Sequence, residues 1–242
     1  MNLPRLYCIV DAALFPVTAD LVAFAAELTA GGCTLLQYRN KSGNARVMLE
    51  QARELRRLFP AYADVESHPF AKDAKGWGTQ DQNPHVSQRQ RDVGHPLTNS
   101  SVRLIMNDRA DLCLAAEFDG VHVGQEDLSP EAVRGIIGPE RWLGVSTHNP
   151  EQLREADLTS ADYLAIGPVF ATSSKDKPDP VVGLEGVRRA RALTCKPLVA
   201  IGGITRANAA SVIEAGADSV AVISDLLREP RKSAEEFFRI LR

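Results

Sequence analysis

The stretch PLVAIGGITRANAASVIEAGADSVAVIS, residues 197–224, contains the smallest unit of the fold that we expect for the whole chain. An apolar run at 197–203 ends in two glycines, a segment with helical spacing follows at 205–216, and a second apolar run occupies 217–224. Short, almost continuously apolar runs are typical of parallel strands buried on both faces, and helices join such strands. The stretch therefore predicts a strand–helix–strand unit.

The same alternation extends over the rest of the 242 residues. Apolar runs predict strands at 6–11, 33–41, 103–108, 118–124, 142–148, 161–170, 197–203 and 217–224. Segments with helical spacing predict helices at 21–32, 45–59, 110–117, 129–138, 150–158, 184–193, 205–216 and 233–242. Eight such units in this length favour one α/β domain over residues 1–242, a closed (β/α)₈ TIM barrel, with an open doubly wound sheet as the alternative.

A polar insertion at 61–102 interrupts this rhythm and has no sustained periodicity. A connection of this length is expected to be either functional or disordered. It contains His68, His85 and His95, whose spacing matches no metal-ligand pattern, so we expect solvated histidines. Because it connects a helix to the following strand, we expect it at the N-terminal face of the barrel.

The composition excludes several classes of function. The formal net charge is −3, so no bulk attraction to nucleic acid is expected. The four cysteines lack zinc-site spacing, and no apolar run approaches the roughly 20 residues of a membrane span. The first residues do not resemble a signal peptide, so we expect a cytoplasmic protein that does not bind membranes. The sequence is compatible with a homo-oligomer but does not predict one.

Chemistry in such barrels is located at the carboxyl ends of the strands. Gln37, Arg39 and Lys41 stand at the end of the second predicted strand, where alternate residues share one face. Two cations and an amide donor suit a phosphate or diphosphate. The alternative is a set of solvated charges at the end of a surface strand.

Asn107, Asp108 and Asp127 follow the third and fourth predicted strands, which are neighbours in a barrel. Mg²⁺ prefers one or two carboxylates together with substrate phosphates, so Asp108 and Asp127 are candidate metal ligands. The alternative is that they cap the helices that begin near Ala110 and Ser129.

The later strand ends carry candidate anion sites. The segment Gly167–Lys175 combines hydroxyl groups with a lysine, and the adjoining loop could close over a substrate or be only a polar loop. The glycines 202–203 and Ser224 follow the seventh and eighth strands, where barrels often bind phosphate. His122, His148 and Asp11 are weaker candidates for catalysis, and a hydrogen-bonded core histidine is the commoner outcome.

The motifs QYRNK (37–41), NDRADLCLAAEFDGVHVGQEDL (107–128), GVSTH (144–148), DYLAIGPVFATSSK (162–175), VAIGGI (199–204) and VAVIS (220–224), in this order, resemble the thiamine-phosphate synthase family. The resemblance covers nearly the whole chain except 61–102. It implies a transferase that joins a hydroxymethylpyrimidine diphosphate to a thiazole phosphate and releases pyrophosphate, with Mg²⁺ as cofactor.

The resemblance also implies roles for individual residues. Pyrimidine diphosphate would be bound by Gln37, Arg39, Lys41, Asn107, Ser146 and Lys175, and of these Arg39, Lys41, Ser146 and Lys175 would act in catalysis. Mg²⁺ would be bound by Asp108 and Asp127. The thiazole phosphate would be bound by Thr172, Ser174, Gly203, Ile223 and Ser224. The family usually has threonine where Ser174 stands, and serine keeps the hydroxyl group.

Other readings of the same barrel are an isomerase of the thiazole phosphate and a non-catalytic sensor of a phosphorylated ligand. The isomerase would need neither the Gln-x-Arg-x-Lys motif nor a metal pair. A further alternative, a phosphate-binding barrel of amino-acid biosynthesis, would need a carboxylate–lysine pair on the early strands that is not evident here. The resemblance also implies a reaction through a pyrimidine-methyl cation that a thiazole nitrogen attacks, a step that would need no general base.

Overall fold

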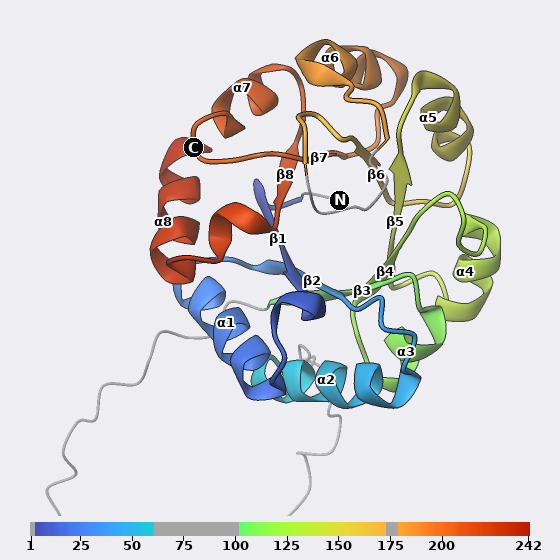
Figure 1. Ribbon diagram of the computed structural model, residues 1–242. Coiled ribbons are helices and arrows are strands. Elements are labelled where there is room, and N and C mark those ends of the chain that lie inside the picture. The colour runs from blue at the N-terminus through green and yellow to red at the C-terminus, as the bar shows by residue number, and fades with distance from the viewer. Residues whose placement is uncertain (1–2, 61–101, 173–178) are drawn as a thin grey trace, which may run out of the picture. The chain divides into compact units, whose positions relative to one another are not determined.

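The computed structural model describes residues 3–60, 102–172 and 179–242. Within these residues, eight parallel strands pair in sequence order, and β8 (Ser219–Val222) pairs with β1 (Leu6–Asp11) to close a barrel. Figure 1 looks along this barrel and shows the strands inside a ring of helices. The closed strand order confirms the (β/α)₈ barrel, and the open doubly wound sheet is excluded.

The remaining strands are β2 (Leu35–Arg39), β3 (Arg103–Asn107), β4 (Gly120–Val123), β5 (Trp142–Thr147), β6 (Tyr163–Ile166) and β7 (Leu198–Ile201). The α-helices are α1 (Thr18–Ala30), α2 (Ala45–Leu58), α3 (Ala110–Ala115), α4 (Pro130–Ile137), α5 (Pro150–Asp157), α6 (Gly183–Leu193), α7 (Ala209–Glu214) and α8 (Pro230–Ile240). Two short 3₁₀ helices, η1 (Ala12–Leu14) and η2 (Ser224–Leu226), follow β1 and β8.

Several predicted strands were too long, most clearly the one at 161–170, which is observed as β6 (Tyr163–Ile166). The apolar residues Val169 and Phe170 lie beyond the strand, where their N–H groups donate to the carbonyls of Ile201 and Gly202. The apolar run therefore predicted which residues are removed from solvent, but it did not predict the residue at which β6 ends. The predicted start of α4 is confirmed, because Ser129 accepts a hydrogen bond from the N–H of Ala132.

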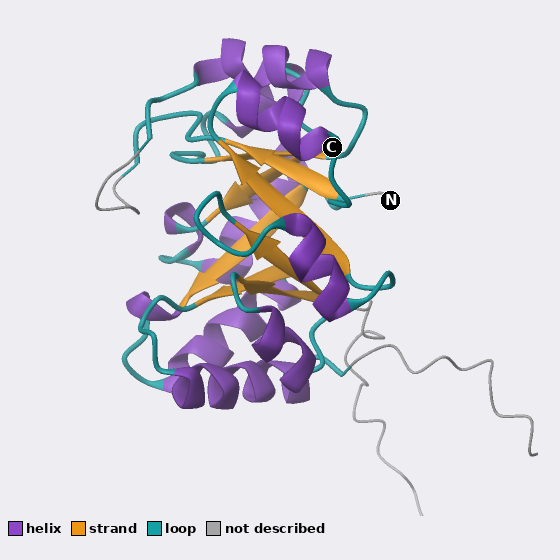
Figure 2. Cartoon of the chain, turned by 90° about the vertical axis from the view of Figure 1, so that its right-hand side faces the viewer, coloured by secondary structure: helices purple, strands orange, loops and turns teal. Residues whose placement is uncertain are grey.

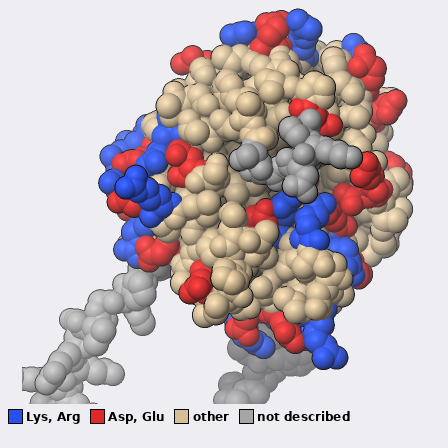
Figure 3. Space-filling model, viewed as in Figure 1, with Lys and Arg blue, Asp and Glu red and all other residues tan. Residues whose placement is uncertain are grey.

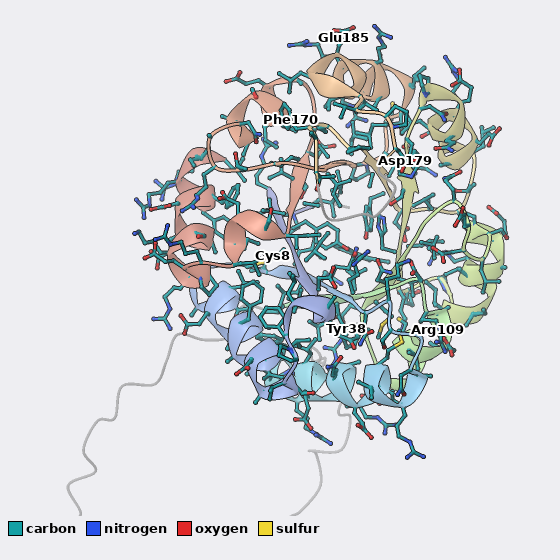
Figure 4. All side chains as sticks on the ribbon, in the orientation of Figure 1. Cys8, Tyr38, Arg109, Phe170, Asp179 and Glu185 are labelled. Carbon is teal, nitrogen blue, oxygen red and sulfur yellow. The ribbon has the colours of Figure 1, made fainter. Side chains whose placement is uncertain are left out.

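Two layers of apolar side chains hold the barrel together. One layer lies between strands and helices and includes Leu21, Phe24 and Phe237. The other fills the barrel interior and includes Tyr7 and Tyr163. Figure 4 shows side chains occupying the space that the ribbon alone leaves open. Inward and outward residues alternate along each strand, so an interior position can be read from the strand period.

Figure 2 shows the barrel from the side, with helices outside the strands. The predicted insertion at 61–102 lies outside the described residues except for Val102, and so do the expected positions of its three histidines. The described neighbours of this segment follow α2 and precede β3, at the end of the barrel opposite to the carboxyl ends of the strands. Among the described residues, no helix is long and apolar enough to cross a membrane.

Candidate active site

Charged side chains of both signs meet at the carboxyl ends of the first strands. Figure 3 views this face and shows basic and acidic side chains beside one another near its middle. Arg39, the last residue of β2, forms an ion pair with Asp11 at the end of β1. Lys41, two residues further, donates to Asp108 after β3 at 2.5 Å. Neighbouring strands thus bring together groups that lie far apart in the sequence.

The three polar residues of the QYRNK motif do not share one environment. Gln37 points into the barrel, where its Nε2 donates to the hydroxyl group of Tyr7 at 2.9 Å. The expectation that Lys41 continues the strand is wrong, because β2 ends at Arg39. Lys41 lies on the following loop and has a half-exposed side chain. The motif therefore supplies one buried amide and two separate cations.

A buried polar cluster fixes the loop that carries Lys41, and the sequence reasoning missed it. The Nδ2 of Asn40 donates to the hydroxyl group of Tyr38 at 3.0 Å and to Oε1 of Gln51, on α2, at 2.9 Å. Oδ1 of Asn40 accepts from the N–H of Ser42 at 2.9 Å. Tyr38, labelled in Figure 4, faces α2 rather than the barrel interior. The sequence did contain a signal for this: Tyr38 is next to Gln37 in a strand, so its side chain must point to the opposite face, toward the helices.

Asp108 and Asp127 lie together, as the sequence predicted for residues at the ends of neighbouring strands. Their carboxyl groups are within hydrogen-bonding reach of each other. Burial raises the pKa of Asp108 above its usual value, Lys41 opposes this rise, and the Asp127 carboxyl adds to it. Asp108 also has a φ of 62°, a left-handed conformation that is uncommon without glycine and that concentrates at functional sites.

Neither carboxylate caps a helix, so the structural alternative for this pair is not supported. The N-cap of α3 is Arg109, with no side-chain hydrogen bond, and that of α4 is Ser129. Asp127 instead accepts from the N–H of Gly124 at 2.7 Å and closes the loop after β4. Helix capping therefore does not explain why aspartates stand at positions 108 and 127.

Asn107 adds a donor that lacks a partner. Its side chain is 8% exposed, and within the described residues no group accepts a hydrogen bond from its Nδ2. An unpaired buried donor costs free energy unless another molecule accepts the hydrogen bond. Its place beside Asp108 makes Asn107 a candidate for binding a substrate oxygen.

The ends of β6, β7 and β8 carry the second candidate group. Gly203 has a φ of 62°, and a Cβ there would lie 2.5 Å from the carbonyl oxygen of Ala171. Glycine is therefore needed where the loop after β7 crosses the segment after β6. Thr172 is half-buried on that segment, Ile223 follows β8, and Ser224 begins η2. Ser174, Lys175 and the predicted closure of their loop lie outside the described residues.

The two histidines are hydrogen-bonded rather than exposed. His122 is buried, its Nδ1 lies 3.1 Å from the hydroxyl of Tyr163, and its Nε2 lies 2.8 Å from that of Ser146. Burial lowers the pKa of His122 to about 4, so its ring is neutral near pH 7. Nδ1 of His148 donates to the carbonyl of Gly167 at 2.7 Å. This geometry favours the expectation of satisfied core histidines.

Known proteins resemble this chain over nearly its whole length. The family model described as thiamine monophosphate synthase matches residues 6–66 and 82–226. The thiamine-phosphate synthase of Koribacter versatilis is 54% identical over 100% of this chain and 97% of its own length. The thiamine-phosphate synthase of Chloroflexus aurantiacus is 39% identical over 91% of this chain and 83% of its own length.

A solved structure agrees with these sequences. The thiamine phosphate pyrophosphorylase of Pyrococcus furiosus superposes with a TM-score of 0.73 and 31% sequence identity, and the match covers 98% of this chain and 95% of that protein. The family model leaves residues 67–81 unmatched, within the predicted insertion, whereas the Koribacter relative aligns along the full chain.

Proposed function

The chain belongs to the thiamine monophosphate synthase family, and from this premise we propose that it joins hydroxymethylpyrimidine diphosphate to thiazole phosphate, releasing pyrophosphate. It is a transferase of thiamine biosynthesis. The observation that carries the proposed site is the meeting of Lys41, Asp108 and Asp127 at the carboxyl ends of the strands. The Arg39–Asp11 ion pair and the unpartnered amide of Asn107 lie at the same end of the barrel.

The difficult step is departure of the diphosphate. The bond between the pyrimidine methylene carbon and the diphosphate oxygen breaks, and its electron pair leaves with pyrophosphate. Negative charge grows on the leaving oxygen, so preorganised donors and cations there lower the barrier. Arg39 and Lys41 are held by carboxylates in the described residues, which keeps their charges in place before the substrate arrives. Asn107, Ser146 and Lys175 complete the proposed diphosphate contacts.

The residues present fit a Mg²⁺ ion. Asp108 and Asp127 place two carboxylates within reach of each other, and their mutual repulsion, together with burial, raises the proton affinity of Asp108. A bound divalent cation would relieve that repulsion and neutralise charge on the leaving diphosphate. Among the described residues no group of three or more potential metal-binding side chains occurs, which suits an ion that takes its other ligands from substrate phosphates and water.

Bond formation requires no general base. The ring nitrogen of the thiazole donates its lone pair to the pyrimidine methylene carbon, and that nitrogen carries no proton to remove. His122 is neutral, hydrogen-bonded and poorly suited to act as a base, which agrees with a reaction that needs none. The protein's own contribution is to orient the two substrates and to exclude water from the cation.

We place the thiazole phosphate at the ends of β6, β7 and β8. Gly203 leaves its backbone close to the segment that carries Thr172, and Ile223 and Ser224 lie at the start of η2. Barrels frequently bind phosphate between their seventh and eighth loops. The proposed contacts are Thr172, Ser174, Gly203, Ile223 and Ser224.

Release of pyrophosphate tests the proposal directly. The purified chain is incubated with both substrates and Mg²⁺, and pyrophosphate and thiamine phosphate are measured over time. We expect both products in equal amounts, and neither when one substrate is omitted. Binding of both substrates without release would favour a sensor, and conversion of the thiazole compound alone would favour an isomerase.

The metal is tested separately from the reaction. Titration of Mg²⁺ into protein with the pyrimidine diphosphate should show saturable binding that Asp127→Ala weakens. Glu155→Gln, on the exposed face of α5, is the matched control and should bind like the parent protein. Equal Mg²⁺ dependence in parent and Asp127→Ala proteins would exclude Asp127 as a ligand.

A further inference from the structure

A continuous chain of hydrogen bonds crosses the interior of the barrel. It begins at Gln37 on β2, whose Nε2 donates to Tyr7 on β1 at 2.9 Å. The hydroxyl groups of Tyr7 and Tyr163 on β6 are 3.0 Å apart. Tyr163 continues to Nδ1 of His122 on β4 at 3.1 Å, and Nε2 of His122 reaches Ser146 on β5 at 2.8 Å. Both ends of the chain are residues that we place at the pyrimidine diphosphate.

The two tyrosines at the centre of this chain are enclosed by apolar side chains. Tyr7 and Tyr163 are each 1% exposed, and Gln37 is also buried. They lie in the interior cluster that contains Ile105, on β3, and Val199, on β7. Because water is excluded there, each polar group depends on its neighbours in the chain, and the network is rigid when every donor has an acceptor.

Glycine at position 144 makes room for the chain. Gly144 lies in the same strand register row as His122 and Tyr163. A Cβ atom at this position would lie 2.1 Å from Cζ of Tyr163 and 2.5 Å from Nδ1 of His122. Any side chain here would therefore displace one of the two rings. The strand sequence thus accommodates the contact between Tyr163 and His122 at the cost of an interior side chain.

The order of donors fixes the direction of the chain. The Nε2 of Gln37 is a donor, so the hydroxyl hydrogen of Tyr7 is left to donate to Tyr163. Tyr163 then donates to Nδ1 of His122. Because Nδ1 accepts, the ring proton of His122 resides on Nε2, which donates to Ser146. In the part of the chain that the structure describes, the reverse direction would leave the hydroxyl hydrogen of Tyr7 buried without an acceptor.

We propose that Tyr7, Tyr163 and His122 are positioning residues that orient the Ser146 hydroxyl as a hydrogen-bond donor to the departing diphosphate. This inference rests on the proposed function. Because Oγ of Ser146 accepts from His122, its own hydrogen points away from the ring and is available to an anionic oxygen. A donor oriented in advance needs no rearrangement when charge develops on the leaving group.

A double-mutant cycle separates positioning from packing. Ser146→Ala should lower kcat about 100-fold, the size expected for one lost donor at a developing anion. Tyr163→Phe should lower kcat by about tenfold, a usual coupling between contacting residues, and should leave KM for the pyrimidine diphosphate largely unchanged. The double variant should be no slower than Ser146→Ala, because Tyr163 acts through Ser146. Effects that multiply would overturn the proposal.

Thr147→Val is the matched control. Thr147, adjacent to Ser146, is 1% exposed, as Tyr163 is, and it donates to the carbonyl oxygen of Ala165 at 2.8 Å, outside the chain of hydrogen bonds. Its loss should lower the melting temperature without weakening the effect of Ser146→Ala. If Thr147→Val shows the same non-additivity as Tyr163→Phe, the coupling reflects general loosening of the barrel and the proposal fails.

The ring proton of His122 gives a readout on the unaltered full-length protein. Nitrogen chemical shifts, assigned by comparison with His122→Gln, distinguish a proton on Nε2 from one on Nδ1. We expect the Nε2–H form at neutral pH. The Nδ1–H form would reverse the direction and exclude a donor role for Ser146, even if Tyr163→Phe did not fold. Absence of pyrophosphate release with the Nε2–H form present would reject the proposed function instead.

Discussion

Both ends of the barrel carry aspartates and basic residues, but these residues are paired differently at the two ends. At the N-terminal end, Asp162 directly precedes β6 and accepts from the N–H of Leu143 at 2.7 Å and from Nη2 of Arg134 at 2.6 Å. At the carboxyl end, Asp108 and Asp127 meet each other and a half-exposed Lys41. Each aspartate at the N-terminal end is matched by an arginine and a backbone N–H, whereas at the carboxyl end two neighbouring carboxylates share one half-exposed lysine.

The N-terminal arrangement occurs three times. In each case an aspartate before an even-numbered strand binds a leucine N–H of the strand before it and an arginine of the helix that leads into that earlier strand (α2, α4 or α6). The sets are Asp119 with Leu104 and Arg56, Asp162 with Leu143 and Arg134, and Asp218 with Leu198 and Arg191. Each arginine also donates to backbone carbonyls of the neighbouring loop. Such contacts at the N-terminal end stabilise the fold, and this end of the barrel is not expected to take part in turnover.

The largest expected effect is at the carboxyl end. Asp108→Ala and Asp127→Ala should each lower turnover by about 100-fold or more, because charge on the leaving diphosphate is then poorly neutralised. Asp108→Ala should not lower the melting temperature, since it relieves repulsion with Asp127. Asp127→Ala also loses the hydrogen bond from the N–H of Gly124 and should lower the melting temperature slightly. Pyrophosphate release and thermal unfolding measure the two properties. Near-normal Mg²⁺-dependent turnover in the double variant would remove the metal site from the model of catalysis.

The next effect is at the N-terminal end and has the opposite character. Asp162→Ala leaves the N–H of Leu143 and the guanidinium of Arg134 without their carboxylate. We expect a loss of about 2 kcal/mol, since the pair is partly solvated, and about 6 °C in Tm for a chain of this size. Turnover at 25 °C should stay the same.

Glu185→Gln provides the control for Asp162→Ala. Glu185 pairs with Arg188 and Arg189 on the exposed surface of α6, where ion pairs contribute little. Its Tm should match that of the parent protein. If Asp162→Ala lowered turnover without lowering Tm, the division of labour between the two ends would be wrong.

The sequence predicted more of the strand order than of the side-chain partners. Apolar runs such as 6–11 and 103–108 placed β1 and β3, and the polar residues after them placed Asp11 and Asp108 at one end. Strand period also shows which residues face inward. It does not show which inward residue meets which across the barrel, so the contact of Tyr7 with Tyr163, 156 positions apart, could not be predicted.

Loop geometry was the other limit. The strand period assigned Lys41 to the face of Gln37, but β2 ends at Arg39, and a buried cluster around Asn40 sets the direction of the chain beyond it. That cluster depends on Gln51 of α2, which no local pattern identifies as a partner. Side chains after a strand end are positioned by tertiary contacts, so their type can be predicted but not their grouping.

A smaller expected effect is the loss of folding stability in acid that is caused by His122, which lies in the barrel interior near the carboxyl ends of the strands. The pKa of His122 is lowered to about 4 by burial, against about 6.5 in an unfolded chain. The unfolded state therefore binds a proton first as pH falls, so the stability present above about pH 6.5 is lost toward about pH 4. Between about pH 7 and about pH 5.5 the loss from this group should be about 1 kcal/mol. His122→Gln should lose less over the same range in denaturant titrations.

The parent chain and His122→Gln must be compared with the same metal content. Within residues 3–60, 102–172 and 179–242, the charged group that affects the pKa of His122 is Asp127, whose negative charge favours the protonated ring and opposes the shift. A pH dependence of stability identical in the two proteins would show that His122 does not titrate differently on folding.

The smallest expected effect is that of removing residues 66–98. The described residues on either side follow α2 and precede β3, so the connection begins and ends at the barrel end that we assign to stability. The family model omits residues 67–81, so the family's matched core does not depend on them. Shortening a loop changes its closure entropy by only about 1 kcal/mol. We expect turnover within about twofold of the parent and a similar Tm, measured by pyrophosphate release and thermal unfolding; a folded deletion variant without turnover would place this segment in the reaction.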